Sequence, residues 1–202
     1  MLKNYLITAL RNMMRQKVFS IINIAGLALS LTAIWVIGLF VADELSYDRY
    51  HKNADRIYRL ASHGQWGEEK FDITGTSGLA AAAFKNDFQE VENTVRIDVE
   101  GGGIMNYGDK TIKDDAVFFT DPSFFSVFTY YFLAGSADAL QQPNSIVLTK
   151  TLAAKLFTSP VAALNKTVYI NKIPNLVTGV IDDIPKNAHF TFNALRAFPK
   201  NY

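Results

Sequence analysis

Hydrophobic residues are concentrated near the start of the chain, in one long stretch without a charged side chain. The 25 residues from Val18 to Ala42 include no Asp, Glu, Lys or Arg. At about 1.5 Å per residue, a helix of that length would cover the ~30 Å hydrocarbon layer of a membrane with room for tilt. The few Ser and Thr residues inside it can bond to carbonyl groups of the same helix. The pattern therefore predicts a transmembrane helix over residues 18–42.

Two other interpretations of this stretch fit less well. A buried helix with 25 uncharged residues is too long for a domain of this size. A cleaved signal peptide has a shorter apolar region and small residues at its exit. Here bulky Phe40 lies two residues before Ala42.

A small-xxx-small pair lies within the predicted membrane helix. Gly26 and Ser30 are four residues apart, so they share one helix face. Small residues on such a face let a second helix approach closely, although they are common in any membrane helix. We predict Gly26 and Ser30 as a helix-packing site.

Apolar residues also recur at helical spacing between Leu2 and Met13, and four bases occupy the other sides. This pattern predicts an amphipathic helix over residues 1–17 that lies along the inner leaflet, with its bases beside anionic head groups. The alternative is a plain continuation of the membrane helix. A basic stretch is poorly suited to the bilayer centre.

Charge differs sharply between the two parts of the chain. Residues 1–42 carry four bases and no acid, whereas the other 160 residues hold the remaining 16 bases and all 19 acids. Because cytoplasmic flanks are enriched in Lys and Arg, we expect a cytoplasmic N-terminus with residues 43–202 on the other side of the membrane. In a bacterium the helix would lie in the inner (cell) membrane, and residues 43–202 would lie in the periplasm or outside the cell. The overall charge of +1 argues against nucleic-acid binding through a broad basic field.

Beyond residue 43 the chain shows short strand and helix patterns in mixed order. Apolar–polar alternation or short apolar runs predict strands at residues 56–61, 71–73, 94–99, 110–119, 145–148, 167–170 and 176–181. Helical patterns occupy residues 79–88, 124–128 and 150–157. Because no strict βαβ series is present, the predicted fold class is α+β, with a mixed α/β domain over residues 43–202.

Local signals mark several boundaries in this domain. Asp121 is predicted to cap a helix with Pro122 in its first turn, and Thr149 to cap the next helix. A turn is expected at residues 171–172 and a flexible break at residues 101–103. Gly179 lies inside a predicted strand, where glycine marks a bulge or a close backbone contact.

Residues that carry chemistry are sparse. The chain has no Cys, which excludes disulfides, Cys-ligated zinc and thiol catalysis. No metal-binding spacing links the histidines, which we expect at the surface or in caps: His51, His63 and His189. The adjacent acids are expected to be solvated charges rather than an acid/base dyad: Asp43–Glu44, Asp114–Asp115 and Asp182–Asp183. We predict no catalytic, cofactor-binding or metal-binding residue, and no enzyme activity.

Several ordered stretches, taken together, point to one family. They include Asp43-Glu44-Leu45-Ser46-Tyr47-Asp48-Arg49-Tyr50-His51 and Asp121-Pro122-Ser123-Phe124-Phe125. The others lie at residues 3–12, 22–30, 53–59, 143–149, 177–181 and 184–190. In this order and spacing the chain resembles the N-terminal part of the MacB/FtsX-type ABC transporter permeases.

The resemblance implies a permease subunit whose first membrane helix is followed by a MacB-like periplasmic core domain. In that family a separate ATPase subunit binds ATP, and the permease couples its closure to periplasmic change for export or mechanotransmission. The implied partners are the lipid bilayer, the ABC ATPase subunit, a second permease copy and a periplasmic adaptor. No cofactor is implied for this chain itself.

The resemblance also sets an expectation about length. Family permeases continue into at least three more membrane helices and a cytoplasmic loop that contacts the ATPase. We therefore expect this chain to be a fragment of a longer permease, with an incomplete core domain. The alternative is a single-span, membrane-anchored periplasmic binding or sensor module that works without an ATPase.

Overall fold

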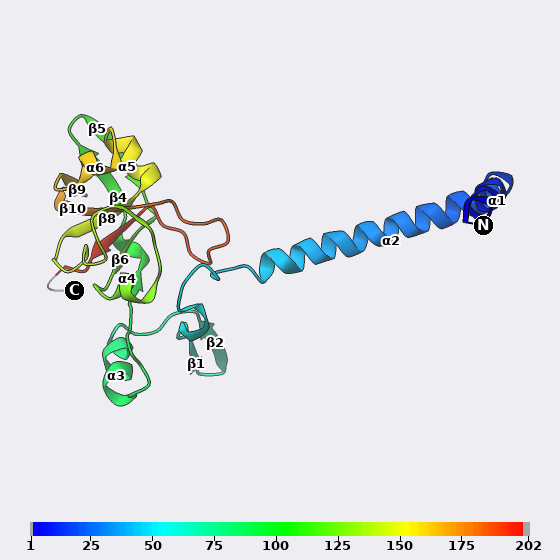
Figure 1. Cartoon of the computed structure of the whole chain (residues 1–202). Helices are drawn as coiled ribbons and strands as arrows, with labels where there is room; N and C mark the ends of the chain where they lie inside the picture. The colour runs from blue at the N-terminus through cyan, green and yellow to red at the C-terminus, as the bar shows by residue number, and fades with distance from the viewer. Residues whose placement is uncertain (1, 200–202) are drawn as a thin grey trace. The chain divides into compact units, whose positions relative to one another are not determined.

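The computed structural model describes residues 2–199, and the chain divides into two compact units, Met1–Tyr47 and Asp48–Tyr202. The first unit consists of α1 (Leu2–Arg15) and α2 (Lys17–Glu44) (Figure 1). The two helices are separated at Gln16, whose φ of −110° and ψ of 59° are not helical. At 28 residues, α2 is about 42 Å long, and none of its side chains is buried.

A mixed sheet organises the second unit, and within the described residues it has nine strands (Figure 1). Its order is β3 (Ile97–Asp98), β6 (Val117–Thr120), β11 (Ala194–Ala197), β8 (Ser145–Thr149), β10 (Ile173–Ile181), β9 (Thr167–Ile170), β4 (Gly103–Tyr107) and β5 (Lys110–Asp114). The ninth strand, β7 (Phe132–Ala134), also pairs with β10. β6 pairs with β11 in parallel, as β8 does with β10, and the other pairs are antiparallel.

The core lies on both faces of this sheet. Every residue of β8 is buried, and alternate residues face opposite sides. Ile146 and Leu148 pack in a cluster with the buried residues of α5 (Lys150–Leu156) and α6 (Pro160–Ala163). Val147 packs in a second cluster with Phe124 of α4 (Phe124–Val127). Burying each such side chain contributes about 1.5–3 kcal/mol, so β8 is stabilised from both faces.

One long segment of the second unit has no core of its own. It holds the hairpin of β1 (Ser62–Trp66) and β2 (Glu69–Ile73) and the helix α3 (Leu79–Asp87). None of residues 57–93, all of which the structure describes, is buried. We call this segment the arm (residues 57–93). Short 3-10 turns lie outside it at Ala54–Arg56 and Val99–Gly101.

The structure confirms the predictions that rested on strong local signals. The strand predicted at residues 145–148 is β8, and that at 167–170 is β9. Thr149 caps α5 by accepting a hydrogen bond from the Leu152 amide. Asn171 and Lys172 adopt positive φ values of 50° and 70°, which suits the tight turn between β9 and β10. At Gly179 the pairing of β10 with β8 shifts register, and a Cβ there would come within 3.0 Å of Phe132.

Three predicted strands are wrong in extent. Residues 56–61 end a 3-10 turn and then run without regular structure, and the first strand begins only at Ser62. Of residues 94–99, only Ile97–Asp98 pair as a strand. Residues 110–119 form two strands rather than one, because Asp114 accepts a hydrogen bond from the Ala116 amide and turns the chain between them.

The predicted flexible break at residues 101–103 is also wrong. Gly101 is buried, and its carbonyl accepts a hydrogen bond of 2.8 Å from Nη1 of Arg196. Gly103 begins β4, a strand that the pattern did not predict, as it did not predict β7 and β11. Glycine has a weak preference for any one backbone conformation, so the contacts within the sheet determine the structure of this segment.

Candidate functional site

α2 is the only helix among the described residues that is long and apolar enough to cross a membrane. Both predicted membrane ends, Val18 and Ala42, lie within it, and they stay predictions. Ser30 donates its hydroxyl to the Gly26 carbonyl at 2.8 Å, and Thr32 bonds to Ala28 in the same way. The hydroxyls of Ser30 and Thr32 are therefore satisfied inside the helix, as the sequence predicts, whereas Ser20 donates to the Met13 carbonyl of α1 at 3.0 Å.

The predicted helix-packing face is open in the structure. A Cβ built on Gly26 would meet nothing within 4 Å, and Ser30 is exposed. Together these residues leave a shallow, small-residue face on α2, to which a second helix could come close. Helix packing at Gly26 and Ser30 stays a prediction.

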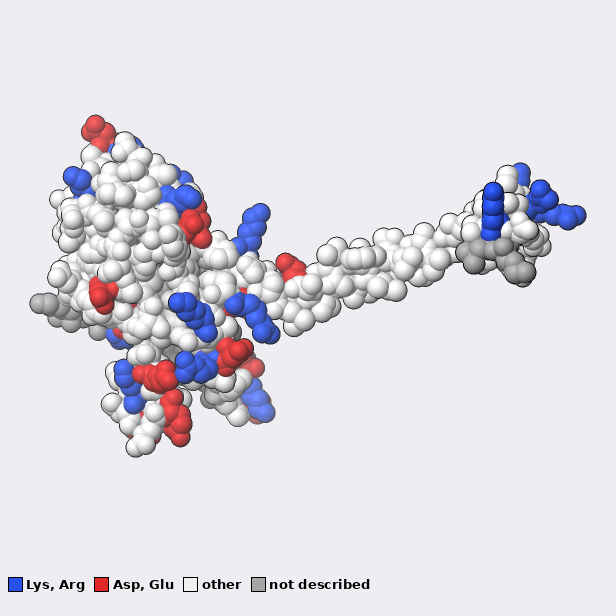
Figure 2. Space-filling model, viewed as in Figure 1, with Lys and Arg blue, Asp and Glu red and all other residues white. Residues whose placement is uncertain are grey.

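The basic residues near the N-terminus collect on α1 and at the start of α2. Figure 2 shows blue side chains around α1 without an acidic one among them, followed by the uncharged length of α2. α1 is a separate helix, since it ends at Arg15 before the break at Gln16. A basic, amphipathic helix beside an apolar one is typical of a segment that lies in the membrane interface.

The second unit begins with a short segment, residues 48–53, that is hydrogen-bonded to a stretch near the C-terminal end of the chain. The amide of Asp48 donates to the Asn187 carbonyl at 2.9 Å. The Asp48 carboxylate accepts a bond from the His189 amide at 3.0 Å and lies 2.6 Å from the His189 ring Nδ1. Asp48 has a φ of +57°, a region that Asp tolerates better than most residues. Residues 48–53 are called the opening segment below.

His51 makes the second attachment of the opening segment. The Thr129 amide donates to its Nδ1 at 3.1 Å, and the Lys52 amide donates to the Thr129 hydroxyl at 3.0 Å. The His51 side chain is 4% exposed and lies among aromatic rings, with Phe128 and Tyr130 edge-on at 5.2 and 5.7 Å. Its Nε2 has no hydrogen-bond partner among the described residues. The expected surface or cap position is therefore wrong for His51.

Burial shapes the titration of this cluster. Desolvation lowers the pKa of His51, although the nearby Asp48 carboxylate acts in the opposite direction. Burial also raises the pKa of Tyr50 and of Tyr130, whose hydroxyls lie 3.5 Å apart. All three rings are thereby held in their neutral forms around pH 7.

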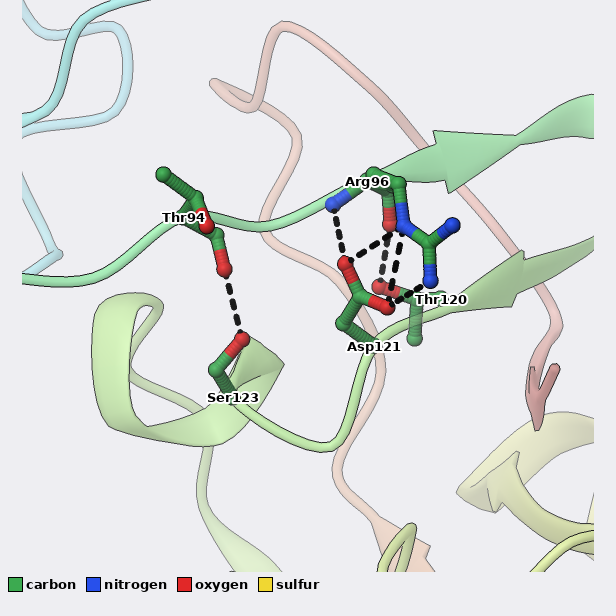
Figure 3. Close-up of polar contacts among 5 residues, drawn as sticks. All are labelled: Thr94, Arg96, Thr120, Asp121 and Ser123. Carbon is green, nitrogen blue, oxygen red and sulfur yellow. Dashed lines mark hydrogen bonds and ion pairs between the residues drawn. The ribbon is translucent and has the colours of Figure 1, made fainter. Parts of the chain in front are cut away.

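A second polar cluster joins the residues that follow the arm to the residues that precede α4 (Figure 3). Asp121 accepts hydrogen bonds from the Arg96 amide at 2.8 Å and from Nη2 at 2.7 Å, and Nε lies 3.1 Å away. Thr120 donates its hydroxyl to the Arg96 carbonyl, and Ser123 donates to the Thr94 carbonyl. Side-chain exposures of 38% for Arg96 and 17% for Asp121 make this a partly desolvated pair.

The Asp121 cluster overturns a predicted cap. α4 begins at Phe124, and the residue at its N-cap position is Ser123, so Pro122 is not in the helix. Asp121 bonds to Arg96, 25 residues away along the chain. A cap and a long-range ion pair need the same residue type, and only the fold decides between them.

Two of the adjacent acids accept hydrogen bonds from other parts of the fold. Asp114 is buried and accepts hydrogen bonds from the Asn193 side chain at 2.9 and 3.1 Å. Asp183 accepts from the amide and hydroxyl of Thr151, at the start of α5. The expectation of a solvated charge is therefore wrong for Asp114, whereas Asp183 and Asp115 are exposed, and Asp115 pairs with Lys113.

No chemical centre emerges from the residues described. The exposed His63 pairs with Asp72 across the hairpin, while His189 pairs with Asp48, so the three histidines lie in different settings. No group of three or more His, Asp and Glu side chains in residues 2–199 could hold a metal ion. An open hollow of about 260 Å³ lies beside Lys52, Phe125 and Ser126. That is smaller than the pockets of roughly 300–1,000 Å³ that bind small molecules.

The sequence missed the opening segment as a site. Asp48 and His189 lie 141 positions apart, and each sits in a different stretch of the family resemblance. The only available signal was a carboxylate in the first stretch and an imidazole in the second. No spacing rule could pair them.

Comparison with solved structures shows the same fold in another protein. A domain named as part of a permease protein from Porphyromonas gingivalis is 26% identical, with a TM-score of 0.64 over 74% of this chain. The chain spans 65% of the length of that domain.

Two more distant structures also match. The periplasmic region of MacB from Actinobacillus actinomycetemcomitans is 22% identical, with a TM-score of 0.44 over 58% of this chain and 54% of its own. The extracellular domain of the noncanonic ABC-type transporter YknZ from Gram-positive bacteria is 17% identical, with a TM-score of 0.46 over 62% and 63%. No curated protein matches the chain.

The sequence also matches a protein-family model over residues 20–198, which extend from α2 to just beyond β11. The model describes the MacB-like periplasmic core domain, found in ABC transporter permeases, and the mixed sheet lies inside the matched range. By this match over most of its length, the chain belongs to the MacB-like periplasmic core domain family.

Proposed function

We propose that this chain is the membrane-anchored, extracytoplasmic core of a MacB/FtsX-type ABC permease. The observation that carries the proposal is the family match over residues 20–198, which joins a membrane-length helix to the core domain in one chain. In this role α2 spans the inner membrane once, and residues 43–202 lie on the periplasmic or outer side. Four bases before the uncharged stretch of residues 18–42 and the acids Asp43 and Glu44 directly after it support that orientation.

The proposed role is mechanical rather than catalytic. A separate ATPase subunit would bind and hydrolyse ATP in the cytoplasm, and the permease would carry the resulting movement across the bilayer. The opening segment is suited to receive such movement, because it begins four residues after Glu44 and is fastened to the core by Asp48 and His51. A second permease copy and a periplasmic adaptor would complete the assembly.

Orientation can be tested directly because the chain has no Cys. We expect a membrane-impermeant maleimide to label Lys70→Cys in intact spheroplasts, since Lys70 is exposed in the hairpin. Asn12→Cys, in α1, should be labelled only after the membrane is opened. The reverse pattern would reject the orientation, and labelling of both would reject a single crossing.

The transporter assignment is tested by purifying the full-length gene product with its membrane partners. We expect an ATPase subunit in the purified complex, seen as vanadate-sensitive ATP hydrolysis. If none is bound and the product still folds in the membrane, the single-span binding or sensor module becomes the better explanation.

Helix packing is tested by enlarging one face of α2. Gly26→Leu would fill the open small-residue face and should reduce association of two permease copies by about tenfold or more, equivalent to roughly 1.4 kcal/mol. Ala28→Leu is the control, since two residues along a helix turn the side chain to the opposite side. If both substitutions lowered the amount of crosslinked dimer equally, association through one specific helix face would be contradicted.

A further inference from the structure

The opening segment contains a buried imidazole whose protonation the surrounding contacts oppose. His51 accepts a hydrogen bond at Nδ1 from the Thr129 amide, so the neutral ring must carry its proton on Nε2. A proton added to the ring would go to Nδ1, where it would face another N–H donor. Protonation is therefore incompatible with the attachment of His51 to Thr129.

We propose that the opening segment is a latch that is closed when His51 is neutral and opened by mild acid. The pH response of the latch does not depend on the proposed function. Its consequence for the transporter does rest on that proposal, because the opening segment follows α2 in the sequence. A closed latch would pass movement of α2 to the sheet. An open latch would release the attachment to Thr129 and keep the attachment through Asp48.

The neighbouring groups determine the direction of the response. Among the charged and titratable groups near the ring, Asp48 and Tyr50 lie on the same segment, and Tyr130 follows α4. His189 contacts Asp48 and so acts on the ring indirectly. Both tyrosines stay neutral in the relevant range, because burial raises their pKa values. The Asp48 carboxylate attracts a proton to His51, but desolvation is the larger effect and the pKa of the ring is lowered.

The sign of the effect follows from linkage between protonation and opening. In the open form His51 is solvated and titrates near its ordinary pKa of 6.5, whereas the closed form binds the proton more weakly. The closed latch is therefore fully favoured above about pH 6.5. As the pH falls below that value, the ratio of open to closed forms rises by up to about tenfold per pH unit, until the closed form also becomes protonated.

The test measures the opening of the segment in the full chain, held in detergent micelles. Spin labels are placed on Lys52→Cys and Ser126→Cys, two exposed positions on the rim of the same hollow. We expect one short distance at pH 8 and a growing second, longer population at pH 5.5. An unchanged distribution between these two pH values would overturn the proposal.

Substitution of each histidine assigns the response. His51→Asn places an amide oxygen close to the position of Nδ1, so it can accept from Thr129 but cannot titrate, and the latch should stay closed at both pH values. His63→Asn, in the exposed hairpin pair, should leave the response unchanged. His189→Asn should shift the populations at both pH values while the response persists. Loss of the response in His189→Asn but not in His51→Asn would overturn the assignment.

A second measurement does not depend on any variant. Nitrogen-15 NMR of histidine-labelled wild-type chain at pH 8 should show His51 as the Nε2–H tautomer. A proton on Nδ1 would contradict the latch geometry. Neither experiment involves an ATPase, so failure of the latch and failure of the transporter proposal are distinguishable.

Discussion

The mixed sheet and the arm belong to the same compact unit, and both contain many apolar side chains, but they bury them differently. All five residues of β8 are buried, whereas no residue of the arm is. Trp66, Phe71 and Ile73 lie on one face of the hairpin, across from polar His63 and Asp72, and that face is exposed. A two-stranded sheet is marginal in water unless it packs against something. Apolar content therefore does not predict stability unless a facing layer covers it.

Amide exchange should show the largest difference between these regions. In the full chain, amides of β8 should exchange only through global unfolding, while those of β1 and β2 should exchange through local opening. We expect protection factors at least on the order of 10³ apart. Mass spectrometry of exchanged peptides measures this, and similar protection in both regions would contradict the comparison.

Removal of one aromatic ring from each region tests the same difference by mutation. Phe124 is fully buried and contacts Phe192 and Tyr130, so Phe124→Ala should lower the free energy of unfolding by about 3–5 kcal/mol. Phe88 is 50% exposed in the arm, and Phe88→Ala should change it by no more than about 1 kcal/mol. Denaturant unfolding followed by the aromatic circular dichroism signal compares them. Equal losses would show that the arm is packed.

Two ion pairs give a smaller contrast. Asp121→Asn weakens the bidentate, partly buried pair with Arg96 and should cost about 1–3 kcal/mol of unfolding free energy. Glu92→Gln removes the pair with Arg56, where the side chains are 73% and 63% exposed, and should change stability by less than about 0.5 kcal/mol. The same denaturant-unfolding experiment measures both losses of stability. Because Asp121 is partly desolvated, a higher salt concentration should reduce the difference between the two losses only slightly. A larger loss from Glu92→Gln would reverse the expected order.

The helix starts provide the smallest contrast. Thr149 accepts from the Leu152 amide at the N-terminus of α5, so Thr149→Ala should cost about 1 kcal/mol. Ser77 accepts from the Leu79 amide one residue before the N-cap of α3, and Ser77→Ala should cost only a few tenths of a kcal/mol. Thermal unfolding of the two variants provides the measurement. A stronger effect at Ser77 would mean that α3 contributes more to the unit than its exposure indicates.

Local signals explain which parts of the fold the sequence predicted. Thr149 followed by a helical run, and Asn171-Lys172 between two strands, are decided by contacts within a few residues. The strand predictions failed where pairing depends on distant partners. Alternation at residues 94–99 became only a two-residue strand, because β6 pairs with Ile97 and Asp98 alone.

Composition and short-range spacing were enough to predict the long apolar helix, the basic start, the family and the strongest strands. Long-range packing was needed to show that His51 is buried, that Asp48 contacts His189, and that Asp121 binds Arg96 instead of capping α4. The physical reason is that a polar side chain can bond to a near or a distant partner at similar free energy. The fold chooses between them by determining which groups are removed from water together.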